Sequence, residues 1–354
     1  MPRAASPLVV RFGRIGDMVL LQPLLRHLHR RFGAPCTLLA RDEWSTSLYA
    51  GHSDVARVLN VRDSHRPLAL SPRQWAALIG LRRLRDAPVY VCEPEPRALA
   101  KARRMLALAG IRPENCVYLT DMPVIADEHW IERLLRFAER TPEAWRHLEV
   151  HTAERAEATP TLELCDEDRS DCADWLREKG WNTAPLVLLQ PANKRTIRWN
   201  GVRGSTDDKW WPTESWAALA RGIRETLPYS CVLLCGSPRE AALLRAIRDE
   251  AAIAGVHVVA DALPLRRLMA LQEIAYSMIS VDTGPAHMAA ALGCPLVVMY
   301  GKVSPQQWLA RGTNAAGVIA IGGPERGGRV EAIGVEEVLT AWARLVPRRA
   351  SQAG

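Results

Sequence analysis

The chain has 354 residues, 48% of them hydrophobic, and a formal net charge of +7. No apolar run approaches the ~18 residues of a transmembrane helix, and no signal-peptide pattern opens the chain, so we expect a soluble, cytoplasmic protein. Nucleic acid is not expected as a partner, because zinc-finger and RNA-binding signatures are missing and Phe and Tyr, which stack on bases, are scarce.

The first predicted strand runs straight into a turn and a helix. Leu8–Phe12 is an apolar strand, Gly13 to Asp17 form the turn, and apolar residues at helical spacing predict a helix over Met18–Phe32. Asp17 therefore lies at the helix start, where an acidic side chain usually does no more than complement the helix dipole. The turn lacks the G-x-G-x-x-G pattern, so a dinucleotide fingerprint is poorly met.

Strands and helices alternate through the rest of the first half, which predicts a parallel sheet. Further strands are expected at Cys36–Ala40, Val55–Val61, Pro88–Cys92 and Cys116–Leu119. Helices are expected at Trp44–Ala50, Pro72–Arg85, Arg97–Ala109 and Asp127–Arg140.

The net positive charge belongs to this first half. Residues 1–150 contain 23 Lys and Arg against 16 Asp and Glu, whereas residues 151–354 contain 23 of each kind. Two clusters hold six of the cations: Arg82, Arg83, Arg85, Lys101, Arg103 and Arg104. Such clusters are most often solvated helix faces, but a one-sided excess also attracts an anionic partner or a membrane surface.

A polar stretch without periodicity separates the two halves of the chain. It predicts a first domain at 1–150, a linker at 151–163 and a second domain at 164–354. Strands in the second domain are expected at Leu186–Gln190, Cys231–Cys235, Val256–Ala260, Met278–Val281 and Leu296–Tyr300, and helices at Glu214–Glu225, Arg239–Ala252 and Leu265–Ala275. Two doubly wound domains follow, and both glycine turns are expected to border one cleft beyond the carboxyl ends of the strands.

Neither the cysteines nor the acidic residues form a metal site by their spacing. The Cys165/Cys172 and Cys231/Cys235 spacings match neither a zinc site nor a redox motif, so reduced core thiols are expected. The D-x-D run at 166–168 begins a predicted helix, where its carboxylates serve as caps.

A long loop between Gln190 and Pro212 combines cations with tryptophans. Its members are Lys194, Arg195, Arg198, Arg203 and Lys209, with Trp199, Trp210 and Trp211. Loops of this length are usually functional or disordered, and tryptophans argue against disorder. Indole faces suit sugar surfaces and the cations suit phosphate, whereas Trp211 and Trp216 are more simply explained by packing under the following helix.

The most informative segment is the turn that follows the strand ending at Val281. Gly284 permits a tight turn and the proline after it suits a first helical position, so the strand runs directly into a helix. Free N–H groups and the dipole at that start predict a phosphate site, with His287 one turn in on the same side. Ordinary capping would explain Asp282 and Thr283 but not the histidine.

Three segments resemble the motifs of glycosyltransferase family 9, the lipopolysaccharide heptosyltransferases. In chain order they are Arg11-Phe12-Gly13-Arg14-Ile15-Gly16-Asp17, Asp207-Asp208-Lys209-Trp210-Trp211-Pro212, and Val281-Asp282-Thr283-Gly284-x-x-His287-x-Ala289-Ala290. The resemblance spans essentially the whole chain. It implies a GT-B fold, in which two Rossmann-like domains face a central cleft with the acceptor on the first and ADP-heptose on the second. It also implies inverting catalysis that is independent of metal.

The resemblance gives each matching residue an expected role. Asp17 matches the general base, with Gly13, Arg14 and Gly16 in the acceptor loop. Lys209 matches the lysine that contacts the donor phosphates. The other donor-binding matches are Asp282, Thr283, Gly284 and His287, and Glu240 is expected to contact the nucleoside. These roles suit the chemistry, because inverting transfer needs a carboxylate near the acceptor hydroxyl and positive or dipolar groups at the departing diphosphate. With Lys209 and a helix start available, no metal or other cofactor is expected.

The chain departs from the family pattern at three places. Gly13-Arg14 occupies the part of the first loop where a serine is common, and Arg14 could engage an acidic acceptor sugar. Lys302 stands where a proline is common. The segment from Gln190 to Asp208 is longer than in the plainest members, which suggests a modified lid or a different acceptor.

Three classes of function remain open. The first is heptose transfer from ADP-heptose to an anionic, lipid-linked glycan, Kdo-bearing or phosphorylated, with peripheral contact at the inner face of the cytoplasmic membrane. The second is a related transfer with another nucleotide sugar or acceptor in surface polysaccharide assembly. The third is a nucleotide-sugar binding module without turnover or a nicotinamide-dependent oxidoreductase. Asp17 speaks against the pure binder, and the missing glycine fingerprint speaks against the oxidoreductase.

Overall fold

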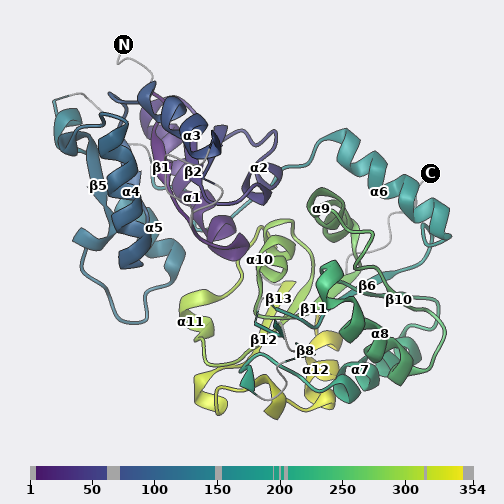
Figure 1. Cartoon of the computed structure of the whole chain (residues 1–354). Helices are drawn as coiled ribbons and strands as arrows, with labels where there is room; N and C mark the ends of the chain where they lie inside the picture. The colour runs from purple at the N-terminus through teal and green to yellow at the C-terminus, as the bar shows by residue number, and fades with distance from the viewer. Residues whose placement is uncertain are drawn as a thin grey trace. The chain divides into compact units, whose positions relative to one another are not determined.

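The chain folds into two α/β units. The computed structural model describes residues 5–61, 72–147, 154–193, 195–198, 201–202, 206–314 and 317–345. The units comprise residues 1–163 and residues 164–354, called unit 1 and unit 2 below. Each contains one parallel sheet with helices on both faces, which confirms the predicted pair of Rossmann-like domains (Figure 1).

Unit 1 is built on a five-stranded sheet. Its strands are β1 (Leu8–Val10), β2 (Cys36–Ala40), β3 (Val55–Asn60), β4 (Val89–Val91) and β5 (Cys116–Tyr118). Its helices are α1 (Ile15–Phe32), α2 (Trp44–Leu48), α3 (Pro72–Arg82), α4 (Pro96–Leu108) and α5 (Trp130–Ala138). The strand order is β3-β2-β1-β4-β5 and every pairing is parallel, as the alternation of strands and helices predicts.

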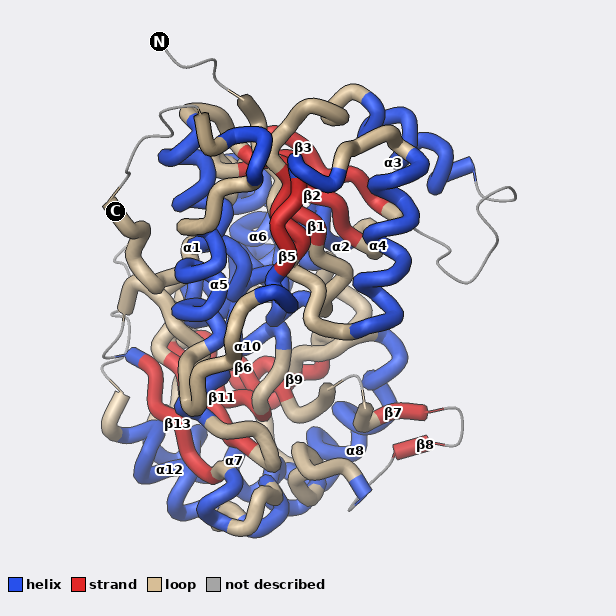
Figure 2. The backbone as a smooth tube through the Cα atoms, turned by 90° about the vertical axis from the view of Figure 1, so that its left-hand side faces the viewer, coloured by secondary structure: helices blue, strands red, loops and turns tan. Residues whose placement is uncertain are grey.

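Two helix layers cover this sheet. Helices α3 and α4 lie on one face, and α1 packs beside α5 on the other (Figure 2). The core under α3 and α4 consists of apolar side chains from both layers, among them Val10, Val91, Leu78, Leu81, Met105 and Leu106. Helix α5 begins three residues later than predicted. Asp127 has a left-handed backbone (φ 58°), and the His129 side chain accepts from the N–H of Ile131 and caps the helix.

The described part of the segment predicted as a linker, residues 154–163, is held on unit 1. The N–H of Thr161 donates to Gln22 of α1 (2.9 Å), and the Thr161 carbonyl lies 3.1 Å from Nε2 of His52. Ala156 and Leu162 are buried. Hydrogen bonds and apolar burial therefore fix this stretch against the helix that carries Asp17.

Unit 2 is built on a six-stranded sheet. Its strands are β6 (Leu186–Gln190), β9 (Cys231–Leu234), β10 (Val256–Val258), β11 (Ser277–Val281), β12 (Leu296–Tyr300) and β13 (Val318–Gly322). Its helices are α6 (Asp166–Lys179), α7 (Thr213–Thr226), α8 (Ala241–Ala251), α9 (Leu265–Ile274), α10 (Gly284–Ala291), α11 (Pro305–Trp308) and α12 (Val335–Ala343). The order is β10-β9-β6-β11-β12-β13, again with parallel pairings.

Helices α7, α8 and α12 cover one face of the second sheet, and α9 and α10 cover the other (Figure 1). Neither β13 nor α12 is among the elements predicted from the sequence. The long loop before α7 also contains a short antiparallel pair, β7 (Ile197–Arg198) with β8 (Gly201–Val202).

The strand order reverses beside the first strand of each sheet. This switch point lies between β1 and β4 in unit 1 and between β6 and β11 in unit 2. In open parallel sheets, ligands bind beyond the carboxyl ends of the strands at such a point. We therefore expect each unit to bind its ligand at the segments that follow these four strands.

The remaining structural predictions have mixed outcomes. All eight cysteines are free, but Cys165 is exposed and Cys116 half-buried, so core placement is wrong for these two. The D-x-D run begins α6 as predicted, and Asp168 accepts from the N–H of Cys165 (3.0 Å). Within the described ranges, no helix has the length and apolar character needed to cross a bilayer.

Candidate functional site

An ion pair between Lys209 and Asp282 lies at the switch point of unit 2. Asp282 directly follows β11, and its N–H donates to the carbonyl of Met299 on the neighbouring strand (2.9 Å). The Lys209 ammonium pairs with the Asp282 carboxylate and also donates to the Asp282 carbonyl oxygen (2.9 Å). The two side chains are only 14% and 9% exposed. The structure thus joins the second and third sequence motifs in one site.

Asp282 is ionised at neutral pH. Burial alone would raise the pKa of its carboxyl group, but the hydrogen bond with His287 and the positive charge of Lys209 outweigh burial and lower the pKa to about 2. The carboxylate therefore balances the Lys209 charge in a site that is largely shielded from water.

The His287 imidazole lies beside the same carboxylate. Its Nε2 is 3.5 Å from Asp282 Oδ1, and the residue is 5% exposed. Nδ1 is buried and has no hydrogen-bond partner within the described part of the chain. Because a buried polar atom without a partner costs free energy, this nitrogen is a candidate contact for a ligand.

The start of α10 has no side-chain cap. Thr283 occupies the N-cap position with extended backbone, and its hydroxyl lies 3.2 Å from the hydroxyl of Ser280 instead of capping the helix. Asp282 is engaged by Lys209, so capping explains neither residue. The helix begins at Gly284, and its first N–H groups, with the dipole behind them, form the kind of end that binds phosphate.

Two aspartates position Lys209. Asp207 accepts from the Lys209 N–H (3.3 Å) and from the Asn193 amide (2.7 Å). Asp208 accepts from the Lys302 N–H (3.0 Å) and forms an ion pair with Arg195 (3.2 Å). The sequence alone does not predict this scaffold, although Asn193 follows β6 at the switch point.

Lys302 can make its contact because it is not a proline. The hydrogen bond to Asp208 uses the backbone N–H of Lys302, which proline lacks. The departure from the family pattern therefore adds an anchor to the segment that carries Lys209.

Two tryptophans near the end of the long loop belong to the core of unit 2. Trp211 and Trp216 are buried, their rings meet edge to face at 5.0 Å, and the Trp211 indole donates to the carbonyl of Ile333 (2.8 Å). Their predicted packing role is confirmed. Lys194, Trp199 and Arg203 lie outside the described residues.

Glu240 caps its own loop. Its carboxylate accepts from the N–H of Ser237 (2.6 Å) and from the Ser237 hydroxyl (3.0 Å). The loop follows β9, which neighbours β6, so Glu240 belongs to the carboxyl edge of the same sheet. Its predicted contact with a nucleoside stays a prediction.

Asp17 lies at the switch point of unit 1, in the first turn of α1. One carboxylate oxygen accepts from Arg11 (2.7 Å) and the other from the N–H of Arg14 (2.8 Å). The side chain is 22% exposed, and a carboxylate has about four lone-pair sites, so acceptor capacity remains for a further partner.

A single buried guanidinium holds this arrangement together. Arg11 is 6% exposed, donates to Asp17 and to the carbonyl of Cys92 (3.0 Å), and lies 3.6 Å from Glu93. Glu93, two residues beyond β4, also accepts from the N–H of Phe12. Burial raises the pKa of Glu93, against the opposing effects of Arg11 and that N–H. The sequence alone does not predict these roles of Arg11 and Glu93, although both follow strands that meet at the switch point.

Glycine is required in the acceptor loop because the packing is close. A Cβ on Gly13 would lie 2.5 Å from the Cβ of Asp17 and 2.8 Å from Arg11 Nε. Gly16 is buried inside α1, whereas the side chain of Arg14 is exposed. Of the three predicted acceptor residues, only Arg14 presents a charged side chain to solvent.

The six cations of the two clusters differ in their exposure to solvent. Five are exposed: Arg82, Arg83, Arg85, Arg103 and Arg104. Arg103 additionally lies over the ring of Tyr118 (4.5 Å). Lys101 is different, because its ammonium nitrogen is buried. The prediction of a solvated face therefore does not hold for Lys101.

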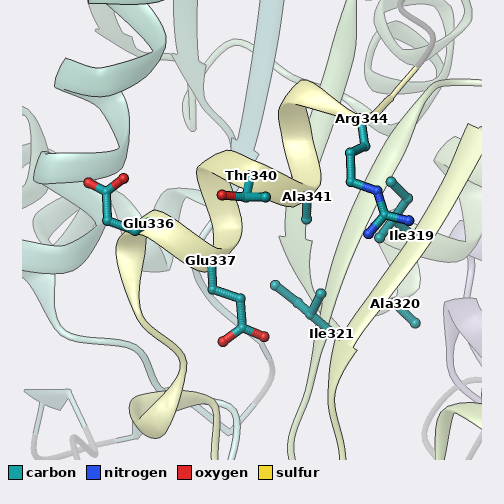
Figure 3. A pocket seen from close by; sticks show the side chains of 8 residues that line it. All are labelled: Ile319, Ala320, Ile321, Glu336, Glu337, Thr340, Ala341 and Arg344. Atoms are coloured by element: carbon teal, nitrogen blue, oxygen red, sulfur yellow. The ribbon is translucent and has the colours of Figure 1, made fainter.

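A cavity of about 340 Å³ lies elsewhere in unit 2, between β13 and α12 (Figure 3). Ile319 and Ile321 line it, with Glu336, Glu337 and Arg344 at its sides. None of the predicted site residues lines it, and we assign it no role. Among the described residues, no group of three or more His, Cys, Asp or Glu side chains is arranged to hold a metal ion.

Comparison with known proteins supports the motif assignment. The family model described as glycosyltransferase family 9 (heptosyltransferase) matches residues 121–327. A curated relative, lipopolysaccharide heptosyltransferase 1 of Salmonella typhimurium, is 34% identical over 110 residues. That match spans 28% of this chain and 30% of the relative.

Solved structures share the whole fold. The glycosyl transferase family 9 structure from Veillonella parvula aligns with a TM-score of 0.73 at 17% identity, covering 96% of each chain. The E. coli heptosyltransferase WaaC with ADP-2-deoxy-2-fluoro heptose aligns with a TM-score of 0.61 at 17% identity, covering 96% of this chain and 99% of that one. These alignments confirm the GT-B fold.

The Lys209–Asp282 pair makes a stability prediction. Asp282→Asn leaves the shielded Lys209 ammonium without its counter-charge and should lower the free energy of unfolding by about 3 kcal/mol at pH 7. Because the folded pKa of Asp282 lies below its ordinary 3.8, the difference should be present above about pH 4 and shrink as the pH falls toward 2. Urea denaturation of both proteins between pH 7 and pH 3 measures it.

The matched control removes both charges. Lys209→Met with Asp282→Asn should regain most of the stability lost in the single variant, because no unpaired charge remains. An equal loss in the single and double variants would show that the ion pair is not what holds the two loops together.

Proposed function

The chain belongs to glycosyltransferase family 9, and from that premise we propose that it transfers a heptose from ADP-heptose to an anionic acceptor of the lipopolysaccharide core. The transfer inverts the anomeric centre and requires no metal. The observation that carries this proposal is the convergence of Lys209, Asp282 and His287 at the uncapped start of α10. This convergence places the Lys209 ammonium and the positive end of the α10 dipole where a diphosphate would leave.

The donor site suits a leaving ADP. The Lys209 ammonium forms an ion pair with Asp282. When a diphosphate binds, the ammonium can donate to a phosphate oxygen as well, so it has an anionic partner both before and after binding. The N–H groups at the start of α10 and the unpartnered Nδ1 of His287 supply further contacts. Such groups stabilise the negative charge that develops on the diphosphate as the glycosidic bond to ADP breaks. The WaaC structure with a fluorinated ADP-heptose supports the choice of donor.

The acceptor site suits general-base catalysis. Asp17 is a partly exposed carboxylate whose direction is set by Arg11 and by the N–H of Arg14. It would accept the proton of the attacking acceptor hydroxyl, while the new bond forms on the face of the sugar opposite the departing ADP. Lys209 and the helix start supply the positive charge on the leaving group, so the proposed mechanism uses no metal.

The general-base role makes the first test of this function. Asp17→Asn should lower kcat by ~10²-fold or more, as removal of a general base does, and leave the affinity for ADP nearly unchanged. Turnover of ADP-heptose with a Kdo-bearing lipid A acceptor is measured by product mass, and ADP affinity by calorimetry. Loss of ADP binding with turnover intact would contradict the role of Asp17.

The same assay tests the donor and the absence of a metal requirement. The parent enzyme should turn over in EDTA and prefer ADP-heptose to UDP- and GDP-sugars. An enzyme that EDTA inactivates and Mg²⁺ restores would overturn the metal-free mechanism. Binding of ADP-heptose without transfer to any glycan would identify a binding module instead.

We also propose peripheral contact between unit 1 and the inner membrane surface. Five exposed arginines are joined by two exposed apolar side chains of α3, Trp75 (44%) and Ile79 (52%). Trp75, Ile79 and Arg82 share one face of that helix, because they are spaced four and three residues apart. Apolar side chains beside arginines are the combination that settles at an anionic lipid surface.

Replacing the five arginines by Gln should release the protein from anionic vesicles. Each cation near such a surface contributes about 1 kcal/mol, so vesicle binding should fall by at least tenfold, with the KM for the sugar nucleotide unchanged. Attraction should also fade with salt, since exposed charges are screened over ~8 Å. The substituted residues are Arg82, Arg83, Arg85, Arg103 and Arg104.

The matched control removes five exposed arginines of unit 2: Arg177, Arg239, Arg245, Arg248 and Arg344. This control has the same net charge and should bind vesicles like the parent. Equal release of both variants would mean that net charge, and not the surface of unit 1, governs membrane contact.

A further inference from the structure

Lys101 carries a buried ammonium that the described residues leave unsatisfied. It lies in the second turn of α4, and its Nζ has no hydrogen-bond partner among the residues that the structure describes. The nearby aromatic ring is that of Phe12, whose centroid is 5.6 Å from the nitrogen. An aromatic face attracts a cation but does not replace its hydrogen bonds with water.

The surroundings of this ammonium are positive. Burial lowers the pKa of Lys101, and the charge of Arg41 lowers it further. Arg41 directly follows β2 and pairs with its neighbour Asp42 (3.2 Å). Asp42 balances Arg41, but the shielded Lys101 ammonium has no such counter-charge among the described residues, which is unfavourable unless an anion joins it.

The position of Lys101 connects it to the proposed base. Phe12 follows β1, and its N–H is held by Glu93. The next residue is Gly13, which packs directly against Asp17. The ring under the Lys101 ammonium therefore belongs to the loop that positions the Asp17 carboxylate.

We infer that Lys101 binds an anionic oxygen group of the acceptor, a carboxylate or a phosphate, beside the hydroxyl that Asp17 deprotonates. This inference rests on the proposed function and adds a residue that contributes to acceptor specificity. Lys101 is thus distinct from the exposed arginines of the same helix, because its buried nitrogen does not reach a membrane surface. The arriving anion would supply the counter-charge that the fold does not provide.

The experiment compares acceptor binding by four proteins in detergent without donor: the parent, Lys101→Met, Lys101→Arg and Arg112→Met. Arg112 is an exposed cation of unit 1 paired with Glu114, so its variant is a matched control. The probes are a Kdo-bearing lipid A, the same molecule with its carboxylates methylated, and the same molecule dephosphorylated. Loss of a charged hydrogen bond should weaken binding of the intact probe to Lys101→Met about tenfold or more.

The remaining arms identify the anion. Lys101→Arg should recover most of the affinity, and Arg112→Met should bind within twofold of the parent. One probe lacks the anion that Lys101 contacts, and Lys101→Met should bind that probe with the parent's affinity. Whether this is the methylated or the dephosphorylated probe distinguishes a carboxylate from a phosphate. Vesicle binding of Lys101→Met should match the parent.

Thermal stability supplies a readout that does not depend on the transfer reaction. Removing an unpaired, shielded charge should raise the Tm of Lys101→Met, by about 2 °C. A purely structural lysine would give a lower Tm. If heptose transfer fails but acceptor binding and Tm behave as stated, the proposed function is wrong and Lys101 remains an anion site.

Three binding results overturn the inference. The first is binding of the intact acceptor by Lys101→Met at the parent's affinity. The second is an equal loss on all three probes, and the third is failure of the parent to bind any of them. A lowered Tm for Lys101→Met would likewise contradict the unsatisfied charge.

Discussion

The ion pair between Lys209 and Asp282 is the interaction on which unit 2 depends for its chemistry. It joins the segment before α7 to the turn after β11, which are far apart in sequence and meet only because the sheet places its strand ends together. An ammonium held this close to a helix start would be costly without a counter-charge. Asp282 supplies that charge, and the scaffold of Asp207 and Asp208 fixes the backbone that presents Lys209.

Unit 1 also has a largely buried ionic cluster at its switch point, but there the carboxylates outnumber the cations. One guanidinium, Arg11, serves two carboxylates, Asp17 and Glu93. In this arrangement the Asp17 carboxylate has a fixed direction and stays partly exposed to solvent. Glu93 is buried, and it fixes the loop after β1 by accepting from the N–H of Phe12. Both units therefore place a small ionic cluster at the strand-order reversal, and each cluster keeps one group available for a ligand.

The fold was largely predictable because its signals are local. Apolar runs such as Leu186–Gln190 and Leu296–Tyr300 match the observed strands, and a strand alternating with a helix leads to a parallel sheet. Strand β13 and helix α12 are not among the predicted elements, although β13 is an apolar run and α12 has apolar residues at helical spacing. The late start of α5 was not predictable from apolar spacing, because it depends on the His129 cap and the left-handed Asp127.

Only those residues of the candidate site that belong to a sequence motif were predictable. Asp17, Lys209, Asp282 and His287 stood in recognisable segments, and the structure brings the last three together. The partners that orient them were not predictable from local sequence. Glu93 and Asn193 reach the site through strand order. Sequence alone places Lys101 in an exposed cluster, whereas its nitrogen is buried and lies over the ring of Phe12.

The central claim is that Lys209 and the start of α10 hold a nucleoside diphosphate, and calorimetric titration with ADP and with adenosine tests it most directly. Lys209→Ala should weaken ADP binding by about tenfold or more and leave adenosine binding unchanged, because the lost contact is a charged hydrogen bond to phosphate. Lys179→Ala, which removes an exposed lysine at the end of α6, should bind both ligands like the parent. Equal weakening of ADP and adenosine by Lys209→Ala, or no weakening of either, would contradict the account.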